Sequence, residues 1–400
     1  MALIEARTRR RLGRQRVRWA AIEIVVAVAL IAGAAFAFVG CTIETGGGAT
    51  TPASPTTTAG QSTDTTVETD NTPSTVTGQS GGDSLASPAE SVAAKLGPSV
   101  VNIAISGTTQ GQQYGGEGSG VIYTADGKII TNNHVVSDQL GDPVGNIEIT
   151  LTTGEKLPAT ILGRDPLTDL AVIKVEAGME LPIATFNTDL PAVGEYAVAI
   201  GSPLGYENSV TLGIVSGLAR SIEGVPGAEG VALANLIQTD APISPGNSGG
   251  ALANASGEVI GINVAYLPPG QTGAVNIGFA IPSVTATKIA DEIISTGSAT
   301  HAYIGVGTRT VTSELQRQFG LSRSSGVLVA EVTPGGPADN AGIQQGDIIV
   351  EIDGEEMVEA SDVLIAVRDK KPGDTVEVTV DRNGTTQVIS VTLEERPAGL

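Results

Sequence analysis

Short apolar runs rich in Val and Ile alternate with Gly, Asn, Asp and Pro turns over the middle of the chain. The runs that predict strands are 100–105, 120–123, 147–151, 170–175, 196–200, 210–215, 259–265 and 278–281. Short strands at this regular spacing predict a mainly β domain, a sandwich or a barrel, over residues 91–298. Val284, Ile289 and Ile293 recur at helical spacing, so we expect a helix over 282–296 to close this domain.

A long apolar stretch precedes the predicted strands. Residues 20–39 contain a single charge, Glu23, and about 20 apolar residues are enough to span the hydrocarbon of a bilayer. The arginines that lie just before this stretch are Arg7, Arg9, Arg10, Arg11, Arg14, Arg16 and Arg18. By the positive-inside rule, residues 1–18 stay in the cytoplasm and the rest of the chain is exported. We therefore expect a transmembrane anchor or signal segment over 19–40.

Two forms of membrane attachment are open for this segment. An uncleaved single-pass anchor fits the length of the apolar stretch. Alternatively, the sequence Phe-Val-Gly-Cys at 38–41 resembles a bacterial lipobox, which would give a lipoprotein anchored at Cys41. Both alternatives tether the folded part of the chain to the outer face of the cell membrane.

Residues 41–90 are dominated by Thr, Ser, Gly and Pro and contain few large apolar side chains. Such a segment cannot bury enough apolar surface to offset the entropy lost on folding. We therefore predict a disordered linker here, whose role is to give the folded domains reach from the membrane.

The net charge of −21, from 22 Lys and Arg against 43 Asp and Glu, is unevenly distributed. Residues 1–18 contribute +6, so the remainder carries −27. So acidic a body excludes a nucleic-acid-binding protein, which needs a basic face. One cysteine excludes a disulfide framework, and two histidines are too few for a Cys/His zinc site, so we expect no metal and no cofactor.

Ser248 lies in the glycine-rich sequence Ser-Pro-Gly-Asn-Ser-Gly-Gly at 244–250. A nucleophilic serine needs an Oγ that projects from a tight turn, and nearby N–H groups that point to the developing oxyanion. Glycines on both sides permit the positive φ angles that such a turn requires. Taken alone, however, this sequence is equally compatible with a glycine-rich hairpin loop.

A nucleophilic serine also needs a base and an orienting carboxylate. His134 follows an apolar strand, although a lone histidine is more often structural, and His301 lies in a polar segment that we interpret as a solvated linker. Asp169 begins an apolar strand, where a buried charge needs a partner, whereas Asp165 precedes a proline and is typical of a turn. We therefore predict a catalytic triad of His134, Asp169 and Ser248.

The order of these three residues along the chain is that of chymotrypsin. Five segments resemble those of the HtrA (Deg) serine proteases and occur in the family order. They are Thr-Asn-Asn-His-Val-Val at 131–136, Thr-Asp-Leu-Ala-Val at 168–172, Ala-Ile-Gly-Ser-Pro-Leu-Gly at 199–205, Gly-Asn-Ser-Gly-Gly at 246–250 and Gly-Phe-Ala-Ile-Pro at 278–282.

This resemblance implies a chymotrypsin-like double β-barrel protease domain. His134 would be the general base, Asp169 its orienting carboxylate and Ser248 the acylated nucleophile. The oxyanion hole would be formed by the backbone N–H groups of Gly246 and Ser248, with Asn247 held between them.

The resemblance also places a substrate pocket and a mobile loop. The pocket residues would be Ile243, Ile277, Gly278 and Phe279. The glycine- and alanine-rich segment 217–235 is a natural candidate for an activation loop.

Residues 302–396 resemble a PDZ domain. Its carboxylate-binding loop would be Tyr303, Ile304, Gly305 and Val306, although these residues alone would indicate only an edge strand. The motifs that follow in PDZ order are Gly-Val-Leu-Val at 326–329, Gly-Gly-Pro-Ala at 335–338, Gly-Asp-Ile-Ile at 346–349 and Ile-Asp-Gly at 352–354. A C-terminal peptide would bind by adding a strand to a sheet edge.

Together these features predict an ATP-independent serine endopeptidase that acts on misfolded or exported proteins at the outer face of the bacterial cell membrane. Peptides bound to the PDZ domain would regulate its activity, and the family resemblance implies a homo-oligomer, a trimer. The alternative is a peptide-binding holdase chaperone or envelope-stress sensor in which proteolysis is minor.

The sequence also predicts substrate preference. The segment Ala-Pro-Ile at 241–243, about where such proteases place the floor of the specificity pocket, carries no acid. A pocket selective for Lys or Arg would need a buried acid there, so we expect cleavage after small or medium aliphatic residues. Cleavage rates on a peptide panel test this, and equal or faster cleavage after Lys or Arg would contradict it.

Overall fold

The computed structural model describes residues 87–109, 112–138, 141–202, 209–222, 232–266, 276–368 and 370–397. The predicted cytoplasmic segment 1–18, the predicted anchor 19–40, Cys41 and nearly all of the predicted linker 41–90 lie outside these residues. Within the described ranges, no helix is long and apolar enough to cross a membrane.

The folded part begins with helix α2, Pro88–Leu96. The Oγ of Ser87 accepts the N–H of Glu90 at 3.2 Å and so caps the first turn of this helix. Val92 and Leu96 are buried in the main hydrophobic core, and a short 3₁₀ turn, η1 at Gly97–Ser99, leads into the first strand. The structured region therefore starts three residues before the predicted boundary at residue 91, because the cap and the buried face belong to this helix.

Six strands form a first closed barrel, in the order β1-β2-β3-β6-β5-β4. They are β1 Val100–Thr109, β2 Gln112–Ile122, β3 Lys128–Asn132, β4 Asn146–Thr150, β5 Lys156–Asp165 and β6 Leu170–Val175. Fully buried aliphatic side chains such as Ile103, Ile122 and Ile149 fill its interior. Strand β5 has no apolar run, because along most of its length exposed and half-buried residues alternate, and the sequence pattern therefore misses it.

A second closed barrel has the order β10-β11-β12-β9-β8-β7. Its strands are β7 Tyr196–Gly201, β8 Ser209–Ile222, β9 Leu233–Thr239, β10 Ala251–Ala253, β11 Val259–Tyr266 and β12 Gly278–Pro282. The two barrels confirm the mainly β, double-barrel fold. The predicted mobile loop at 217–235 is wrong at both ends, because 217–222 belong to β8 and 233–235 to β9, while 223–231 lie outside the described residues.

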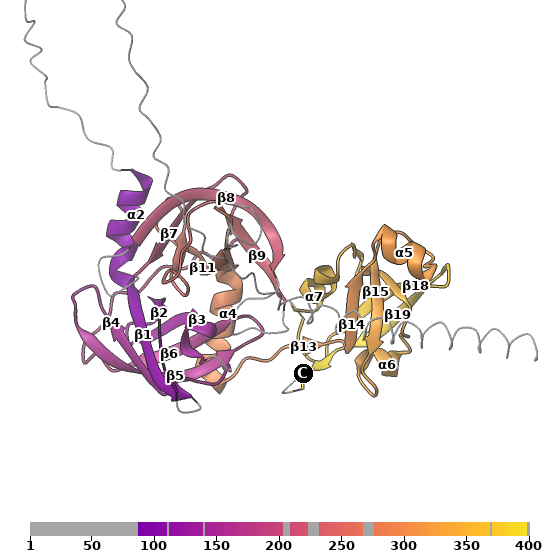
Figure 1. Cartoon of the computed structure of the whole chain (residues 1–400), viewed down its shortest axis with the longest axis horizontal. Coiled ribbons are helices and arrows are strands. Elements are labelled where there is room, and N and C mark those ends of the chain that lie inside the picture. The colour runs from indigo at the N-terminus through magenta and orange to yellow at the C-terminus, as the bar shows by residue number, and fades with distance from the viewer. Residues whose placement is uncertain are drawn as a thin grey trace, which may run out of the picture. The chain divides into compact units, whose positions relative to one another are not determined.

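Helix α4, Ser283–Thr296, closes the protease region as predicted. Its buried face contributes Ala286, Ile289, Ala290 and Ile293 to a core cluster that also contains side chains of both barrels. Figure 1 shows this helix running beside the strands of both barrels. Gly297 ends it with a φ of +87°, a left-handed conformation that glycine adopts without a steric penalty.

The C-terminal region is a separate sheet domain, with strands in the order β14-β15-β16-β18-β19. Its elements are β13 Ala302–Tyr303, β14 Val306–Thr310, α5 Ser313–Phe319, β15 Val327–Val332, α6 Pro337–Ala341, β16 Ile348–Ile352, β17 Glu355–Glu356, α7 Ala360–Arg368, β18 Thr375–Arg382, β19 Thr385–Thr392 and β20 Glu394–Glu395. Strand β14 is at the edge of this sheet, and Figure 1 shows α7 next to it. Val363 and Val367 of α7 pack into the core of the domain.

A buried ion pair in this domain gives a stability prediction. Nε and Nη2 of Arg382 each donate to the carboxylate of Asp347 at 2.7 Å, and Asp347 is only 1% exposed. Removing the guanidinium leaves a buried charge without its partner, so we expect Arg382→Met to lower the free energy of unfolding by about 3 kcal/mol. Hydrogen exchange of the β16 and β18 amides in the full chain measures this. Arg317→Met, at an exposed position, is the control, and equal protection in both variants would contradict the prediction.

Candidate active site

The structure brings His134 and Asp169 together as a bonded pair. His134 begins the 3₁₀ turn η2, His134–Val136, just after β3, and Asp169 ends the turn between β5 and β6. The His134 Nδ1 lies 2.7 Å from one carboxylate oxygen of Asp169, and the His134 backbone N–H donates to the other at 2.9 Å. An Nδ1 that donates to a carboxylate leaves Nε2 as the free acceptor, which is the tautomer that a general base needs.

Asp169 is held in an unusual backbone conformation. Its φ is +57°, in the left-handed region, and the residue is fully buried. The Asp169 carbonyl accepts the backbone N–H of Asn133 and the side-chain Nδ2 of Asn132, both at 3.0 Å. Hydrogen bonds from residues 132 and 133 therefore fix the backbone of this aspartate, while the two bonds from His134 offset the cost of burying its charge.

The same turn holds a second buried carboxylate, Asp165, which is 4% exposed. Its partner is His301, whose Nε2 lies 2.9 Å from each carboxylate oxygen and whose side chain is 13% exposed. The interpretation of His301 as a solvated residue is therefore wrong. The buried Asp165 carboxylate needs a hydrogen-bond donor, and the His301 ring lies where it can donate to it. The turn role of Asp165 is confirmed, since its carboxylate accepts the Leu167 N–H at 3.3 Å.

Ser248 lies on a loop of the second barrel, between β9 and β10. In this structure its Oγ donates to the carbonyl of Val264 at 3.0 Å. Among the hydrogen bonds of the described residues, none joins Ser248 to His134. The two loops nevertheless meet at Gly118, where an added Cβ would lie 2.6 Å from the side chain of Val135 and 3.3 Å from the Ser248 carbonyl oxygen. Rotation of the hydroxyl away from Val264 is thus required before Ser248 can donate to a base.

The predicted oxyanion-hole residues divide into two kinds. The N–H of Asn247 donates to the Ser244 carbonyl at 3.0 Å, so it is not available to a substrate. The N–H groups of Gly246 and Ser248 have no acceptor in the described part of the chain. Gly246 and Gly249 have φ angles of +97° and +81°, so the loop uses glycine at the positions where its backbone is left-handed.

Ser119 of β2, in the first barrel, holds the loop 240–250 that carries the predicted nucleophile, Ser248, and the sequence analysis missed this serine. Its hydroxyl donates to the Gly246 carbonyl at 2.6 Å and accepts the Ser202 N–H at 2.8 Å. Its backbone N–H donates to the Ser248 carbonyl at 2.8 Å. The side chain is fully buried, so all of these bonds are protected from water. A buried serine within Gly-Ser-Gly is the signal that could have drawn attention to it.

Comparison with known proteins agrees with this geometry. Residues 118–262 match the trypsin-like peptidase domain, and residues 302–393 match the PDZ domain. The chain is 42% identical over 281 residues to a probable periplasmic serine endoprotease, DegP-like, of Chlamydia trachomatis, which covers 70% of this chain and 54% of that protein. It is 40% identical over 318 residues to the serine protease PepD of Mycobacterium tuberculosis, over 76% of this chain and 65% of that protein.

A solved structure is similar over nearly its whole length. The HtrA-type protease AlgW with a decapeptide has a TM-score of 0.63 and 33% identity, and the match covers 78% of this chain and 99% of that one. The chain belongs to the HtrA family of serine proteases. It spans about half the length of the curated DegP-like relatives it matches. The family resemblance seen in the five sequence motifs is therefore confirmed.

A half-buried arginine, Arg164, supports the turn that carries His134 in this HtrA protein. Nη1 of Arg164 donates to the Ser137 hydroxyl at 2.7 Å and to the Asn133 side-chain oxygen at 3.3 Å. Burial lowers the pKa of the Arg164 guanidinium, while the nearby Asp142 and Asp138 carboxylates raise it. An arginine stays protonated at neutral pH, so the turn that carries His134 is held by a full positive charge.

The predicted pocket residues occupy different surroundings. Ile243 packs directly on Gly278, where an added Cβ would lie 2.8 Å from the Ile243 Cδ1. Phe279, the next residue on β12, belongs to the main core cluster, and Ile277 packs against that cluster. Their assignment to substrate binding stays a prediction. No group of three or more His, Cys, Asp or Glu that could hold a metal ion occurs among the described residues.

The predicted PDZ loop is placed between β13 and β14. Gly305 has a φ of +81°, and the carbonyls of Gly305 and Ile304 accept the N–H groups of Thr333 and Ala338, both at 2.9 Å. The Tyr303 hydroxyl lies 2.7 Å from the Thr333 Oγ1. Because these carbonyls bind inside the domain, the loop is held rigidly beside the edge strand β14.

We expect Ser119→Ala to lower kcat of peptide hydrolysis by about 10-fold with little change in KM, because the nucleophile loop loses the hydroxyl that positions Gly246. Steady-state kinetics on a chromogenic peptide measures this effect. Ser106→Ala makes the same chemical change at an exposed position of β1 and is the control. A kcat for Ser119→Ala equal to that of the control would show that this hydroxyl does not position the loop.

Proposed function

We propose that this chain is an ATP-independent serine endopeptidase that cleaves misfolded or exported proteins. The observation that carries the proposal is the bond of 2.7 Å between His134 Nδ1 and the fully buried Asp169. A histidine oriented in this way, on the same side of Gly118 as a glycine-flanked serine loop, is the arrangement that acyl transfer requires.

In the proposed mechanism, the Ser248 hydroxyl first turns from the Val264 carbonyl toward His134. His134 Nε2 takes the hydroxyl proton as the Ser248 oxygen attacks the peptide carbonyl. The N–H groups of Gly246 and Ser248 stabilise the resulting oxyanion. His134 then gives the proton to the leaving amine, and a water molecule activated by the same ring hydrolyses the acyl-enzyme. Asp169 stabilises the imidazolium throughout and stays ionised.

We also propose that peptides regulate this activity. Strand β14 is at the edge of its sheet and α7 lies next to it, so a C-terminal peptide of an unfolded protein can add a strand there while Tyr303–Val306 receives its carboxylate. The solved AlgW structure that resembles this chain carries a decapeptide. Assembly into a trimer belongs to the same proposal and follows from the family.

The proposed location is the outer face of the bacterial cell membrane. Its support is the apolar stretch over 19–40, the seven arginines before it, and the name of the DegP-like relatives, which are probable periplasmic endoproteases. The segment acts as a single-pass anchor with the N-terminus in the cytoplasm, and a lipid on Cys41 is the alternative attachment.

One observation favours the second candidate function, a peptide-binding holdase or envelope-stress sensor. The Ser248 hydroxyl is bonded to the Val264 carbonyl, which makes the site unreactive in this arrangement. If that arrangement persists when peptide is bound, the PDZ domain alone would carry the function.

Labelling with a fluorophosphonate probe distinguishes the two functions. We expect the full chain to be labelled, and a peptide that ends in a free carboxylate to increase the rate. Ser248→Ala should abolish labelling, and His134→Ala should reduce peptide hydrolysis by at least about 10⁴-fold because the base is lost. Absence of labelling that depends on Ser248, with and without peptide, would support the holdase instead.

A further inference from the structure

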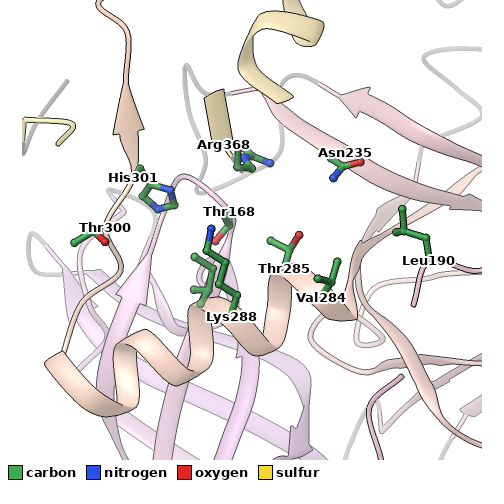
Figure 2. Close-up of a pocket in the computed structure, with 10 residues that line it drawn as sticks. Thr168, Leu190, Asn235, Val284, Thr285, Lys288, Thr300, His301 and Arg368 are labelled. Atoms are coloured by element: carbon green, nitrogen blue, oxygen red, sulfur yellow. The ribbon is translucent and has the colours of Figure 1, made fainter. Parts of the chain in front are cut away.

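The turn between β5 and β6 carries both buried carboxylates of the histidine pairs. Asp169 orients His134, while Asp165, four residues earlier, is bonded through both oxygens to His301 Nε2 at 2.9 Å. Figure 2 shows the His301 ring beside Thr168, which belongs to this turn. The two histidines of the chain therefore hold the two ends of the five-residue segment 165–169, which consists of the last residue of β5 and the four-residue turn that follows it.

The Asp165 carboxylate also holds the interior of the turn. It accepts the Leu167 N–H at 3.3 Å and a short hydrogen bond from the Thr168 hydroxyl. Thr168 is buried and directly precedes Asp169. A displacement of Asp165 is thus transmitted through one bond to Thr168, the residue next to Asp169, and through a second bond to Leu167.

His301 is anchored by its main chain to the PDZ domain. Its carbonyl accepts the Arg396 N–H at 2.9 Å, and the next two residues, in β13, pair with β20 near the end of that domain. On its other side, the Thr300 N–H donates to the Glu292 carboxylate of α4 at 3.1 Å. His301 is therefore the residue at which the protease and PDZ domains join, with its side chain in the first and its carbonyl in the second.

Three charged groups surround the His301 ring. Asp165 bonds to it from the β5–β6 turn, and Lys288 of α4 and Arg368 of α7 line the same cavity (Figure 2). Arg368 also donates to the Leu167 carbonyl at 3.4 Å, so the PDZ domain touches the turn a second time. Within the described part of the chain, Lys288 lines the cavity but makes no hydrogen bond or ion pair with the turn, which makes it a suitable control.

We propose that His301 is a positioning residue, which acts through Asp165 to hold the turn that presents Asp169 to His134. This inference rests on the proposed catalytic role of that pair. Because the main chain of His301 is bonded to the PDZ domain, strain at the domain junction would reach Asp169 indirectly, through Asp165 and Thr168. Misplacement of the His134 ring lowers the rate of the chemical step, whereas the binding of the substrate is unaffected.

The test compares four variants of the full chain: His301→Phe, His301→Gln, Asp165→Asn and the control Lys288→Met. Phe keeps the ring volume without a donor, and the Gln amide can replace the Nε2 donor. We expect His301→Phe and Asp165→Asn to lower kcat by about 10-fold at an unchanged KM, and His301→Gln to restore most of the loss. The kcat and KM of Lys288→Met should equal those of the wild-type chain.

A spectroscopic signature separates this role from a merely structural one. The downfield proton resonance of the His134 Nδ1–H reports its bond to Asp169, and it should broaden or shift in His301→Phe but not in His301→Gln or Lys288→Met. If His301→Phe keeps both the resonance and kcat, the inference is overturned. If His301→Phe fails to fold, the comparison of Asp165→Asn with His301→Gln decides, and equal kcat in these two variants overturns the inference.

Labelling and kcat together distinguish failure of the positioning role of His301 from failure of the proposed protease function. Labelling of Ser248 by the fluorophosphonate probe in the unchanged chain supports the protease function. Labelling together with normal kcat in all His301 variants rejects only the positioning role. Absence of labelling in the unchanged chain rejects the protease function, and the positioning role falls with it.

Discussion

The proposed active site depends on one buried charge. The Asp169 carboxylate is completely removed from water, and a charge in such surroundings is tolerated only where donors surround it. The donors come from His134, through both its ring and its backbone N–H. The His134 ring orientation that general-base chemistry needs therefore results from the hydrogen bonds that the buried Asp169 carboxylate requires. The bonds from His134 to this carboxylate also help to maintain the left-handed φ of Asp169.

The loop of Ser248, the proposed nucleophile, is held near this pair by a contact between the barrels. Ser248 belongs to a loop of the second barrel, yet a serine of the first barrel binds the carbonyls on either side of Asn247. Ser119 is thus a single buried group that sets the distance between the two halves of the site. Closed barrels have rigid sheets, so a site placed at their junction can be adjusted by loop residues without disturbing either core.

The junction between the protease domain and the PDZ domain also depends on hydrogen bonds of a buried polar side chain. The contacts of the PDZ domain with the protease domain include a histidine bonded to a second buried aspartate, four residues before Asp169, and an arginine, Arg368, that donates to the Leu167 carbonyl. The PDZ domain and the proposed catalytic carboxylate consequently contact the same short segment of chain. Asp165 needs a partner for its buried charge just as Asp169 does. The two aspartates differ in which histidine the fold brings to each, His301 to Asp165 and His134 to Asp169.

The sequence alone determined the elements whose signal is local. The apolar runs identified strands such as β6, the helical spacing identified α4, and the glycine-flanked Ser248 and the strand-end His134 marked the candidate chemistry. Tertiary structure alone decided the rest: the burial of His301, the hydroxyl of Ser248 on Val264, and the role of Ser119, whose partners lie 83 and 127 residues away. The physical reason is that periodicity reports which face of an element is apolar, whereas burial of a polar group and the identity of its hydrogen-bond partner are set when distant segments close on one another.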